Sequence, residues 1–392
     1  MSLAAGHLIP QDTALVTWHP TTMQDSIPPI ETTSGTALRI GVIAHLRHPI
    51  RPPFMGGMEA HTHRLTQLLL ARGHQVILVA SGESDPAFPL HAALLQGYEK
   101  SFPSAGFHDT AALHDWLDAQ WSRIGATLAT LDVDVLHNNS LHPEPLRVAR
   151  ANRIPMVTTL HVPPFHTLRE AVREVVAPWM LTTLPSNTQV SRWWDVAPPN
   201  LRVIPNGIDL QRWKFNEKGN GSAVWCGRIA PNKAPALAAE AALRAGLPLM
   251  IYGATEDGAY FTNVVEPLLG ERVRYGGHLA GAALSSAIGA ASVLLFTPMW
   301  DEPFGLAAAE ALACGVPVAS FENGAAREVI GDCGRYATPG DVVGLATALR
   351  GALDIPRAMC RVRAEVCFAE DKMIAAFEGA YHAALSAARL SA

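Results

Sequence analysis

The sequence predicts an α/β protein made of two doubly wound domains. Its 392 residues correspond to two or three domains of about 150 residues each. Short apolar runs alternate with helical stretches over most of the length, which is typical of parallel sheets covered by helices. The composition, with 49% hydrophobic and 17% charged residues, is that of a folded chain and excludes disorder for most of it.

The first domain is predicted over residues 38–215. Residues 37–46, ALRIGVIAHL, form a nearly continuous apolar run, which favours a buried parallel strand. Residues 59–74 place several leucines on one helical face and end beside Gly73, a common helix stop. Residues 75–81 are again apolar. Strand, helix and strand in this order predict a right-handed crossover in a parallel sheet.

The same alternation continues through the rest of the first domain. It predicts helices near 110–130 and 143–152 and strands at 133–138 and 155–161. Residues 1–37 lack apolar periodicity and are rich in Pro, Thr, Ser and His, so we expect an N-terminal extension outside the core.

A second Rossmann-like domain is predicted over residues 216–365. It opens with the polar, glycine-rich segment 216–221, NEKGNG, which is the best linker candidate in the chain. A C-terminal helix, 366–392, is expected to pack back toward the first domain. The predicted elements of the second domain are strands at 222–228, 248–253, 272–277, 291–298 and 315–321, with helices near 234–245, 281–290 and 305–313.

Composition excludes several classes of partner. The formal charge is −5, with 30 basic residues spread among 35 acidic ones, so we expect no nucleic-acid partner. No apolar run reaches the roughly 18 residues of a membrane span and no signal sequence is visible, so we expect a cytoplasmic protein without a transmembrane segment. The five cysteines form no CxxC pair, which favours reduced thiols and no metal site.

Ligands of doubly wound sheets bind at the carboxyl ends of the strands, so the loops there are the first candidates for a binding site. The first such loop contains Gly56 and Gly57. It lacks the GxGxxG of dinucleotide-binding turns, and the chain has neither a Walker loop nor a serine nucleophile elbow. NAD enzymes and kinases are therefore disfavoured. The glycine pair lets backbone N–H groups approach an anion or a sugar, although a plain flexible turn explains it equally well.

The loop after the strand 291–298 leads into a helix that begins near Phe304. The N–H groups of Phe304, Gly305 and Leu306 would then lie at a helix N-terminus, where the helix dipole favours a phosphate.

Two glutamates flank this helix start. Glu302 precedes it, and Glu310 lies within the apolar stretch LAAAEALA. A buried carboxylate is costly unless it accepts hydrogen bonds, and a ribose diol supplies two donors. The alternative is that Glu310 is an exposed helix residue.

Two cations, Arg228 and Lys233, follow the first strand of the same domain. On a strand-end loop that faces a helix N-terminus, they could bind a diphosphate and compensate the charge that develops on it. Solvated surface charges are the alternative for an isolated pair.

Together these segments resemble the retaining nucleotide-sugar glycosyltransferases of family 4, which have the GT-B fold of two Rossmann-like domains facing each other across a cleft. The likeness extends over residues 38–385 and is most specific in the second domain. The matching motifs are a Glu-x7-Glu at Glu302–Glu310, an approximate GR…K at Gly227–Lys233, PNGID at Pro205–Asp209, ACGVPV at Ala313–Val318 and Gly-x-x-x-Glu at Gly324–Glu328.

The resemblance implies a role for each site residue of the second domain. Glu310 would bind the ribose hydroxyls and Glu302 the hydroxyls of the donor sugar. Arg228 and Lys233 would neutralise the diphosphate, assisted by the amides of residues 304–306.

In the first domain, His161 in TTLHVPP matches a family histidine near the donor sugar and the acceptor. Gly57, with Gly56 beside it, would lie near the diphosphate or the acceptor. The sequence departs from the family at Ala234, where glycine is usual, and at the Met-Trp-Asp segment 299–301.

The resulting hypothesis is a retaining glycosyltransferase that moves a sugar from a nucleoside diphosphate, with UDP expected, to a hydroxyl of a small-molecule, glycan or lipid-linked acceptor. The implied mechanism is front-side: the leaving phosphate takes the acceptor proton. No cofactor or metal is expected, because the only Asp-x-Asp, Asp132 to Asp134, lies at the amino end of a predicted strand. A nucleotide-sugar epimerase or glycan phosphorylase on the same fold, or a non-catalytic nucleotide-sugar-binding protein, remain alternatives.

Overall fold

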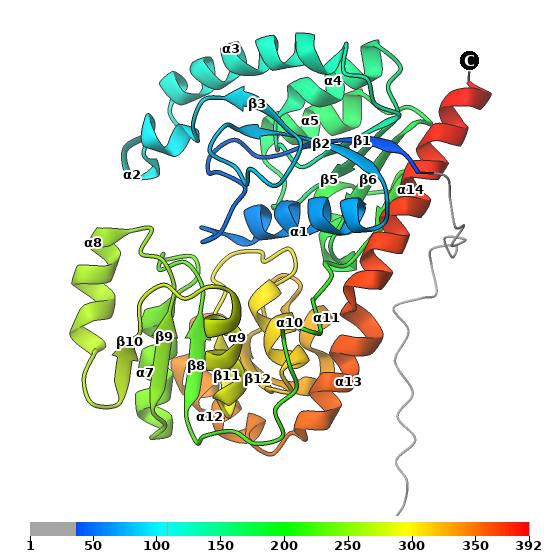
Figure 1. The fold of residues 1–392 in the computed structure, drawn as a ribbon. Coiled ribbons are helices and arrows are strands. Elements are labelled where there is room, and N and C mark those ends of the chain that lie inside the picture. The colour runs from blue at the N-terminus through cyan, green and yellow to red at the C-terminus, as the bar shows by residue number, and fades with distance from the viewer. Residues whose placement is uncertain (1–36, 108, 392) are drawn as a thin grey trace, which may run out of the picture. The chain divides into compact units, whose positions relative to one another are not determined.

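Two parallel sheets organise the protein, each covered by helices (Figure 1). The computed structural model describes residues 37–107 and 109–391. The predicted N-terminal extension therefore lies, except for Ala37, outside the described residues.

The sheet of the first domain has seven strands in the order β3-β2-β1-β4-β5-β6-β7, and every pairing is parallel. The chain order reverses between β1 and β4, which is the arrangement that opens a ligand crevice at the carboxyl ends of these strands. Its strands are β1 (Arg39–Ile43), β2 (Gln75–Ser81), β3 (Leu90–Leu94), β4 (Val135–Asn138), β5 (Met156–Thr159), β6 (Met180–Leu184) and β7 (Leu201–Val203).

Helices cover this sheet because each has an apolar face to bury. In the first of them, Leu65 and Leu69 are fully buried against the sheet, and the helix stops where Gly73 adopts a positive φ of 88°. The helices are α1 (Gly57–Ala71), α2 (Ser104–Phe107), α3 (Ala111–Leu128), α4 (Pro143–Ala151), α5 (His166–Glu174) and α6 (Val190–Trp193).

The second domain repeats this plan with six parallel strands in the order β10-β9-β8-β11-β12-β13. The chain order of this sheet reverses between β8 and β11. The strands are β8 (Ala223–Cys226), β9 (Leu249–Tyr252), β10 (Val273–Tyr275), β11 (Val293–Phe296), β12 (Val318–Phe321) and β13 (Gly334–Ala337), and the helices are α7 (Pro235–Ala245), α8 (Gly258–Tyr260), α9 (Gly281–Ala290), α10 (Leu306–Ala313), α11 (Ala326–Ile330) and α12 (Val342–Ala352).

The predicted fold class, two doubly wound α/β domains, is confirmed, although four strands were missed. Strand β3 is a half-exposed edge strand that contains alanines and a histidine, residues that do not favour strands. Strand β6 is fully buried, but two threonines interrupt its apolar run. Strands β7 and β13 are short and exist because a neighbouring strand pairs with them.

The chain passes from the first domain to the second just before the predicted linker. Ile204 lies in the core around β1, whereas Ile208 and Trp213 lie in the core of the second domain. The linker itself packs on the second domain, because the side-chain amide of Asn216 donates to the carbonyl of Gly289 at 3.1 Å.

The chain ends in two helices, α13 (Arg357–Phe368) and α14 (Glu370–Leu390). Helix α13 packs in the second core through Cys360 and Phe368. Helix α14, red in Figure 1, buries Phe377 and Tyr381 in the first core and packs against β4, β5 and β6. The Tyr381 hydroxyl also bonds His137 Nδ1 at 2.6 Å. The C-terminal segment thus joins both cores.

Candidate active site

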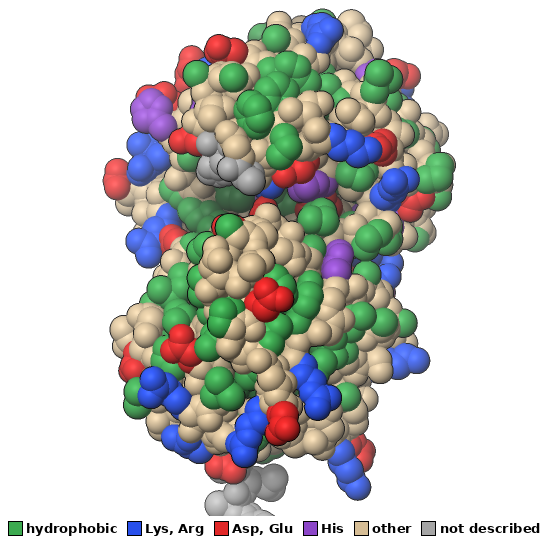
Figure 2. Space-filling model, turned by 90° about the vertical axis from the view of Figure 1, so that its left-hand side faces the viewer, with side chains coloured by type: hydrophobic (Ala, Val, Ile, Leu, Met, Phe, Trp, Pro, Cys, Tyr) green, Lys and Arg blue, Asp and Glu red, His purple; other side chains and the backbone are tan. Residues whose placement is uncertain are grey.

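A cavity of about 530 Å³ lies between the carboxyl ends of the two sheets. Figure 2 shows the side of the molecule on which the surface is hollowed between the domains. All ten residues selected from the sequence line this cavity. They are Gly56, Gly57, His161, Arg228, Lys233, Glu302, Phe304, Gly305, Leu306 and Glu310.

One wall is the start of α10. Gly305 has a φ of 93°, and a Cβ there would lie 2.7 Å from the Phe296 ring, so this turn requires glycine. The helix begins at Leu306, close to the predicted start near Phe304, because the left-handed conformation of Gly305 precedes it; the Phe304 side chain is buried edge-on against Phe368 at 5.4 Å. The first helical amides are consequently those of Leu306 and Ala307. Ala307, which the sequence analysis missed, also lines the cavity.

The start of α1 forms the opposite wall. Gly56 precedes the helix and no side chain caps it. A Cβ on Gly57 would lie 2.9 Å from Leu306 Cδ1, so glycine allows the two helix starts to approach closely. Two helix N-termini, each with a partial positive charge, therefore meet at one cavity.

Lys233 and Glu302 form an ion pair at the cavity wall, with Nζ 2.5 Å from Oε2. Trp300 completes the group: its Nε1 donates to the same oxygen at 2.7 Å, and the Lys233 ammonium lies 4.7 Å from the centre of its ring. Glu302 is 7% exposed, so these two donors satisfy a buried carboxylate. Trp300 was missed as a site residue, although the unusual segment 299–301 was the signal for it.

The loop that carries Glu302 is shaped by Gly324. This residue has a φ of 56°, and a Cβ on it would lie 2.3 Å from the backbone N and O of Glu302. The N–H of Ala325 donates to the Glu302 carbonyl at 2.8 Å. The Gly-x-x-x-Glu segment thus fixes the backbone of Glu302.

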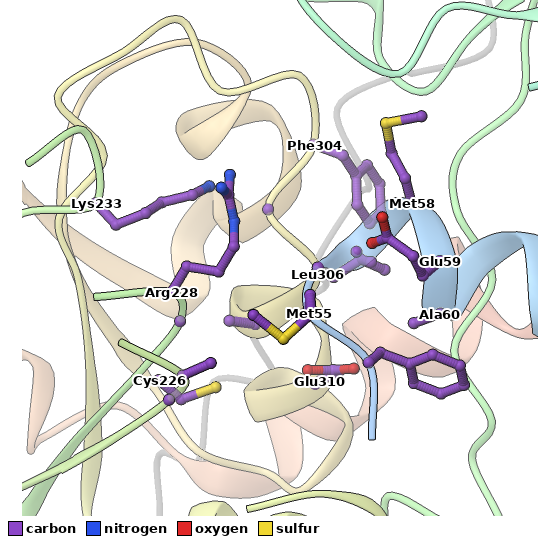
Figure 3. A pocket seen from close by; sticks show the side chains of 18 of the residues that line it. Met55, Met58, Glu59, Ala60, Cys226, Arg228, Lys233, Phe304, Leu306 and Glu310 are labelled. Carbon is purple, nitrogen blue, oxygen red and sulfur yellow. The ribbon is translucent and has the colours of Figure 1, made fainter. Parts of the chain in front are cut away.

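Arg228 extends into the cavity from the segment after β8, with Lys233 on the same side and Glu59 of α1 across from them (Figure 3). Arg228 is paired with Glu256, which also accepts from Arg47 of the first domain at 3.1 Å. Sequence reasoning missed both Glu256 and Arg47, because single charges in loops carry no motif. An ion-pair chain therefore connects the two domains at the cavity.

Glu310 lies half-buried at the cavity wall. Burial raises the pKa of its carboxyl to about 8, against a smaller opposing effect of Arg212. Its side chain makes no hydrogen bond to any residue within the described part of the chain. Glu310 is thus not a freely exposed helix residue: it presents a carboxyl with a raised pKa to the cavity.

His161 extends from the loop after β5. Its Nε2 lies 2.8 Å from Asn139 Oδ1, so Nε2 donates and Nδ1 is left as an acceptor. Burial lowers the pKa of His161 well below its usual range, and the neighbouring His61, at a ring distance of 4.7 Å, acts in the same direction. His137 and Thr62 bond Asn139 at 3.2 and 3.3 Å. The imidazole is therefore neutral and held in one orientation.

The Asp-x-Asp pair lies away from this cavity, before the start of β4, as predicted. Both Asp132 and Asp134 pair with Arg39, the latter at 3.0 Å. Across residues 37–107 and 109–391, no group of three or more His, Cys, Asp or Glu side chains could hold a metal ion. In the same part of the chain, no helix is long and apolar enough to cross a membrane.

Comparison with known proteins gives the class that this fold and site define. The family model Glycosyltransferase Family 4 matches residues 55–212, and Glycosyl transferases group 1 matches residues 221–354. The two matches cover most of the chain, one on each domain. The chain belongs to the family 4 glycosyltransferases, and it is a glycosyltransferase of the GT-B type.

Two relatives agree with this assignment, and a solved structure agrees with the fold. A glycogen synthase of Mycobacterium tuberculosis is 27% identical over 363 residues, covering 79% of this chain and 85% of the relative. A phosphatidyl-myo-inositol mannosyltransferase of Mycobacterium leprae is 26% identical over 336 residues, covering 80% and 86%. The structure of Anabaena HepE in complex with UDP-glucose matches with a TM-score of 0.64 at 18% identity, covering 86% of this chain and 97% of that one.

Proposed function

We propose that this protein is a retaining glycosyltransferase that moves a sugar from a nucleoside-diphosphate sugar to an acceptor hydroxyl without a metal ion. The observation that carries the proposal is the convergence of two helix N-termini and two cations, Arg228 and Lys233, on one cavity. This is a set of groups suited to a diphosphate, because the negative charge grows on it as the sugar leaves.

These two cations and two helix N-termini, called the diphosphate clamp below, can act without a metal because their charges are already in place. Lys233 is held by Glu302 and Trp300, and Arg228 by Glu256, so neither has to be ordered during the reaction. Removing one such preorganised donor typically costs a factor of about 100 to 1,000 in turnover. Fixed cations and helix amides can therefore take the place of a divalent ion.

The arrangement also supports a front-side path with retention. Glu302 already pairs with Lys233 and accepts from Trp300, which suits it to orient sugar hydroxyls rather than to attack carbon. The acceptor hydroxyl would then add on the face from which the phosphate leaves, and its proton would pass to a leaving phosphate oxygen. Bond breaking to the diphosphate and bond formation to the acceptor balance in this step without a protein nucleophile.

His161 would assist at the sugar end of the cavity. Its Nδ1 is the free acceptor of a neutral ring and could take a hydrogen bond from a sugar hydroxyl. Glu310 would serve the nucleoside end, where the ribose hydroxyls would donate hydrogen bonds to its carboxyl.

UDP is the nucleotide we propose, supported by the likeness to HepE, whose structure contains UDP-glucose. The names of the two relatives point to a glycan and a lipid-linked inositol as acceptors. The roles proposed for Arg228, Lys233, Glu302 and Glu310 on the donor side are the same for either acceptor.

The test is product analysis with labelled UDP-sugars and a panel of glycan and lipid acceptors, with the anomeric configuration read by NMR. We expect acceptor-dependent transfer with the donor's configuration retained. Conversion of the donor sugar without any acceptor would indicate an epimerase, and phosphate-dependent release from a glycan a phosphorylase. Donor binding with neither transfer nor hydrolysis would indicate a binding protein.

A further inference from the structure

Glu328 of α11 makes the most fully satisfied contact between the two domains. Its Oε1 accepts from the N–H and the side-chain amide of Asn187, at 2.7 and 3.1 Å. Its Oε2 accepts from the N–H and the hydroxyl of Thr188, at 2.8 and 2.6 Å. One carboxylate of the second domain thus caps the segment that follows β6 in the first domain.

The capped segment also holds the loop that carries Glu302. The hydroxyl of Ser186 donates to the carbonyl of Pro303 at 2.7 Å, and Ser186 is 1% exposed. Arg192 pairs with Asp301 at 2.8 Å. The residues on either side of Glu302 are therefore both attached to the first domain.

Glu328 itself belongs to the segment that shapes this loop from the other side. That segment begins with Gly324, which packs on the Glu302 backbone. Its end is also fixed, because Arg363 of α13 donates to the backbone carbonyl of Glu328 at 2.6 Å. Segments 186–192, 301–303 and 324–328 therefore form one connected assembly, and Glu302 lies at its cavity side.

We propose that Glu328 is a positioning residue for the reaction: by fastening residues 187 and 188 to the second domain, it holds Glu302 in place against the donor sugar. The inference rests on the proposed function, since it uses the role of Glu302 there. Small displacements of a group that orients substrate have large effects on turnover. Losing Glu328 should consequently lower turnover more than nucleotide binding.

The test compares Glu328→Gln with Glu322→Gln. Glutamine keeps the shape of Glu328 but turns one acceptor oxygen into an NH₂ group, which faces two donors in either orientation of the amide. Glu322 pairs with the exposed Arg327 on the same stretch of chain, so its variant controls for the loss of a nearby acid. We expect kcat to fall about tenfold in Glu328→Gln, with the Kd for UDP within about twofold of wild type. Glu322→Gln should match wild type in both.

A double-mutant cycle separates positioning from general loss of stability. If Glu328 acts through Glu302, adding Glu328→Gln to a Glu302→Ala background should change kcat little further. An equal fall in kcat in both backgrounds would overturn the proposal, and so would unchanged kcat in the single variant.

Hydrogen exchange of the peptide over 299–306 gives a readout that needs no donor. Faster exchange in Glu328→Gln, but not in Glu322→Gln, supports the positioning of the loop. Unchanged exchange would contradict it even if transfer is observed. If exchange rises but wild type transfers no sugar from any nucleotide, the proposed function fails while the coupling of Glu328 to the loop stands.

Discussion

At the scale of single residues, Glu310 is the carboxyl group of the site whose pKa is raised by burial. Its pKa of about 8 in the folded state exceeds the ordinary value of 4.5. At a pH between these two values, the carboxyl is protonated in the folded state and ionised in the unfolded state. The free energy of unfolding should therefore fall as pH rises from about 5 to above 8. Because the carboxyl faces the cavity, solvent reduces the effect, and we expect the free energy of unfolding to fall by about 2 kcal/mol over this range.

Urea denaturation at pH 5.5 and 8.5 measures this change in the free energy of unfolding. Glu310→Gln should lose the pH-dependent component, and the exposed Glu217→Gln should retain it. The assignment would be wrong if wild type and Glu310→Gln changed equally between the two pH values.

Lys233 is the second residue whose removal has a defined cost. In Lys233→Ala, Glu302 keeps only Trp300 as a partner, and its charge is buried. We expect the free energy of unfolding to fall by about 2 kcal/mol, less than for a fully buried pair because Lys233 keeps some exposure. We also expect turnover to fall about 100-fold or more.

The double variant Lys233→Ala/Glu302→Gln separates the two effects. A neutral glutamine needs no cation, so thermal stability should largely return while activity stays low. Recovery of both would show that Lys233 serves stability alone.

At the scale of elements, sequence patterns predicted those parts of the fold that carry continuous apolar runs or fixed turn residues. The strands β1 and β11 and the start of α10 belong to this group. Strands β3 and β7 are edge strands; the first is half-exposed and the second has only three residues, so neither leaves a clear apolar run in the sequence. Trp300 and Glu256 were not predicted as site residues, because their contacts with Lys233 and Arg47 form only when the loops fold together.

Two histidines of the first domain, His137 and His161, are likewise explained only by packing. His137 bonds Tyr381 on one side and Thr159 and Asn139 on the other, and burial lowers its pKa to about 3. These imidazoles are neutral members of a buried hydrogen-bond network that connects α14 to the loop of His161.

Tyr381→Phe tests the attachment of α14. It leaves Nδ1 of His137 without its partner, and we expect a loss of about 1 to 2 kcal/mol in urea denaturation. Tyr98→Phe is the comparison, because its bond to His45 is longer, at 3.3 Å, and it should cost less. Equal losses would mean that the network contributes nothing specific.

The position of the only Asp-x-Asp pair relative to the strand ends is one reason to expect transfer without a metal ion. Asp132 and Asp134 lie before β4 and pair with Arg39, at the end of the sheet opposite the cavity. We expect the rate of transfer to be unchanged by excess EDTA. Loss of transfer in EDTA and its return with Mn²⁺ would contradict the clamp.

At the scale of the whole molecule, our central proposal is that the second domain binds a nucleoside diphosphate through fixed cations, helix amides and Glu310. Both domains supply the cavity, and α14 and Glu328 hold them together. The fold, and the ten residues that line the cavity, could be predicted from the sequence because strand-end loops and motifs are local. The contacts between domains could not, because they join residues more than a hundred positions apart.

Calorimetric titration of UDP into wild type, Lys233→Ala and Glu310→Ala, all in EDTA, tests this claim most directly. We expect wild type to bind and each variant to bind at least about tenfold more weakly, a loss of roughly 1.4 kcal/mol or more. Wild-type affinity in both variants, or binding that appears only when Mn²⁺ is added, would contradict it.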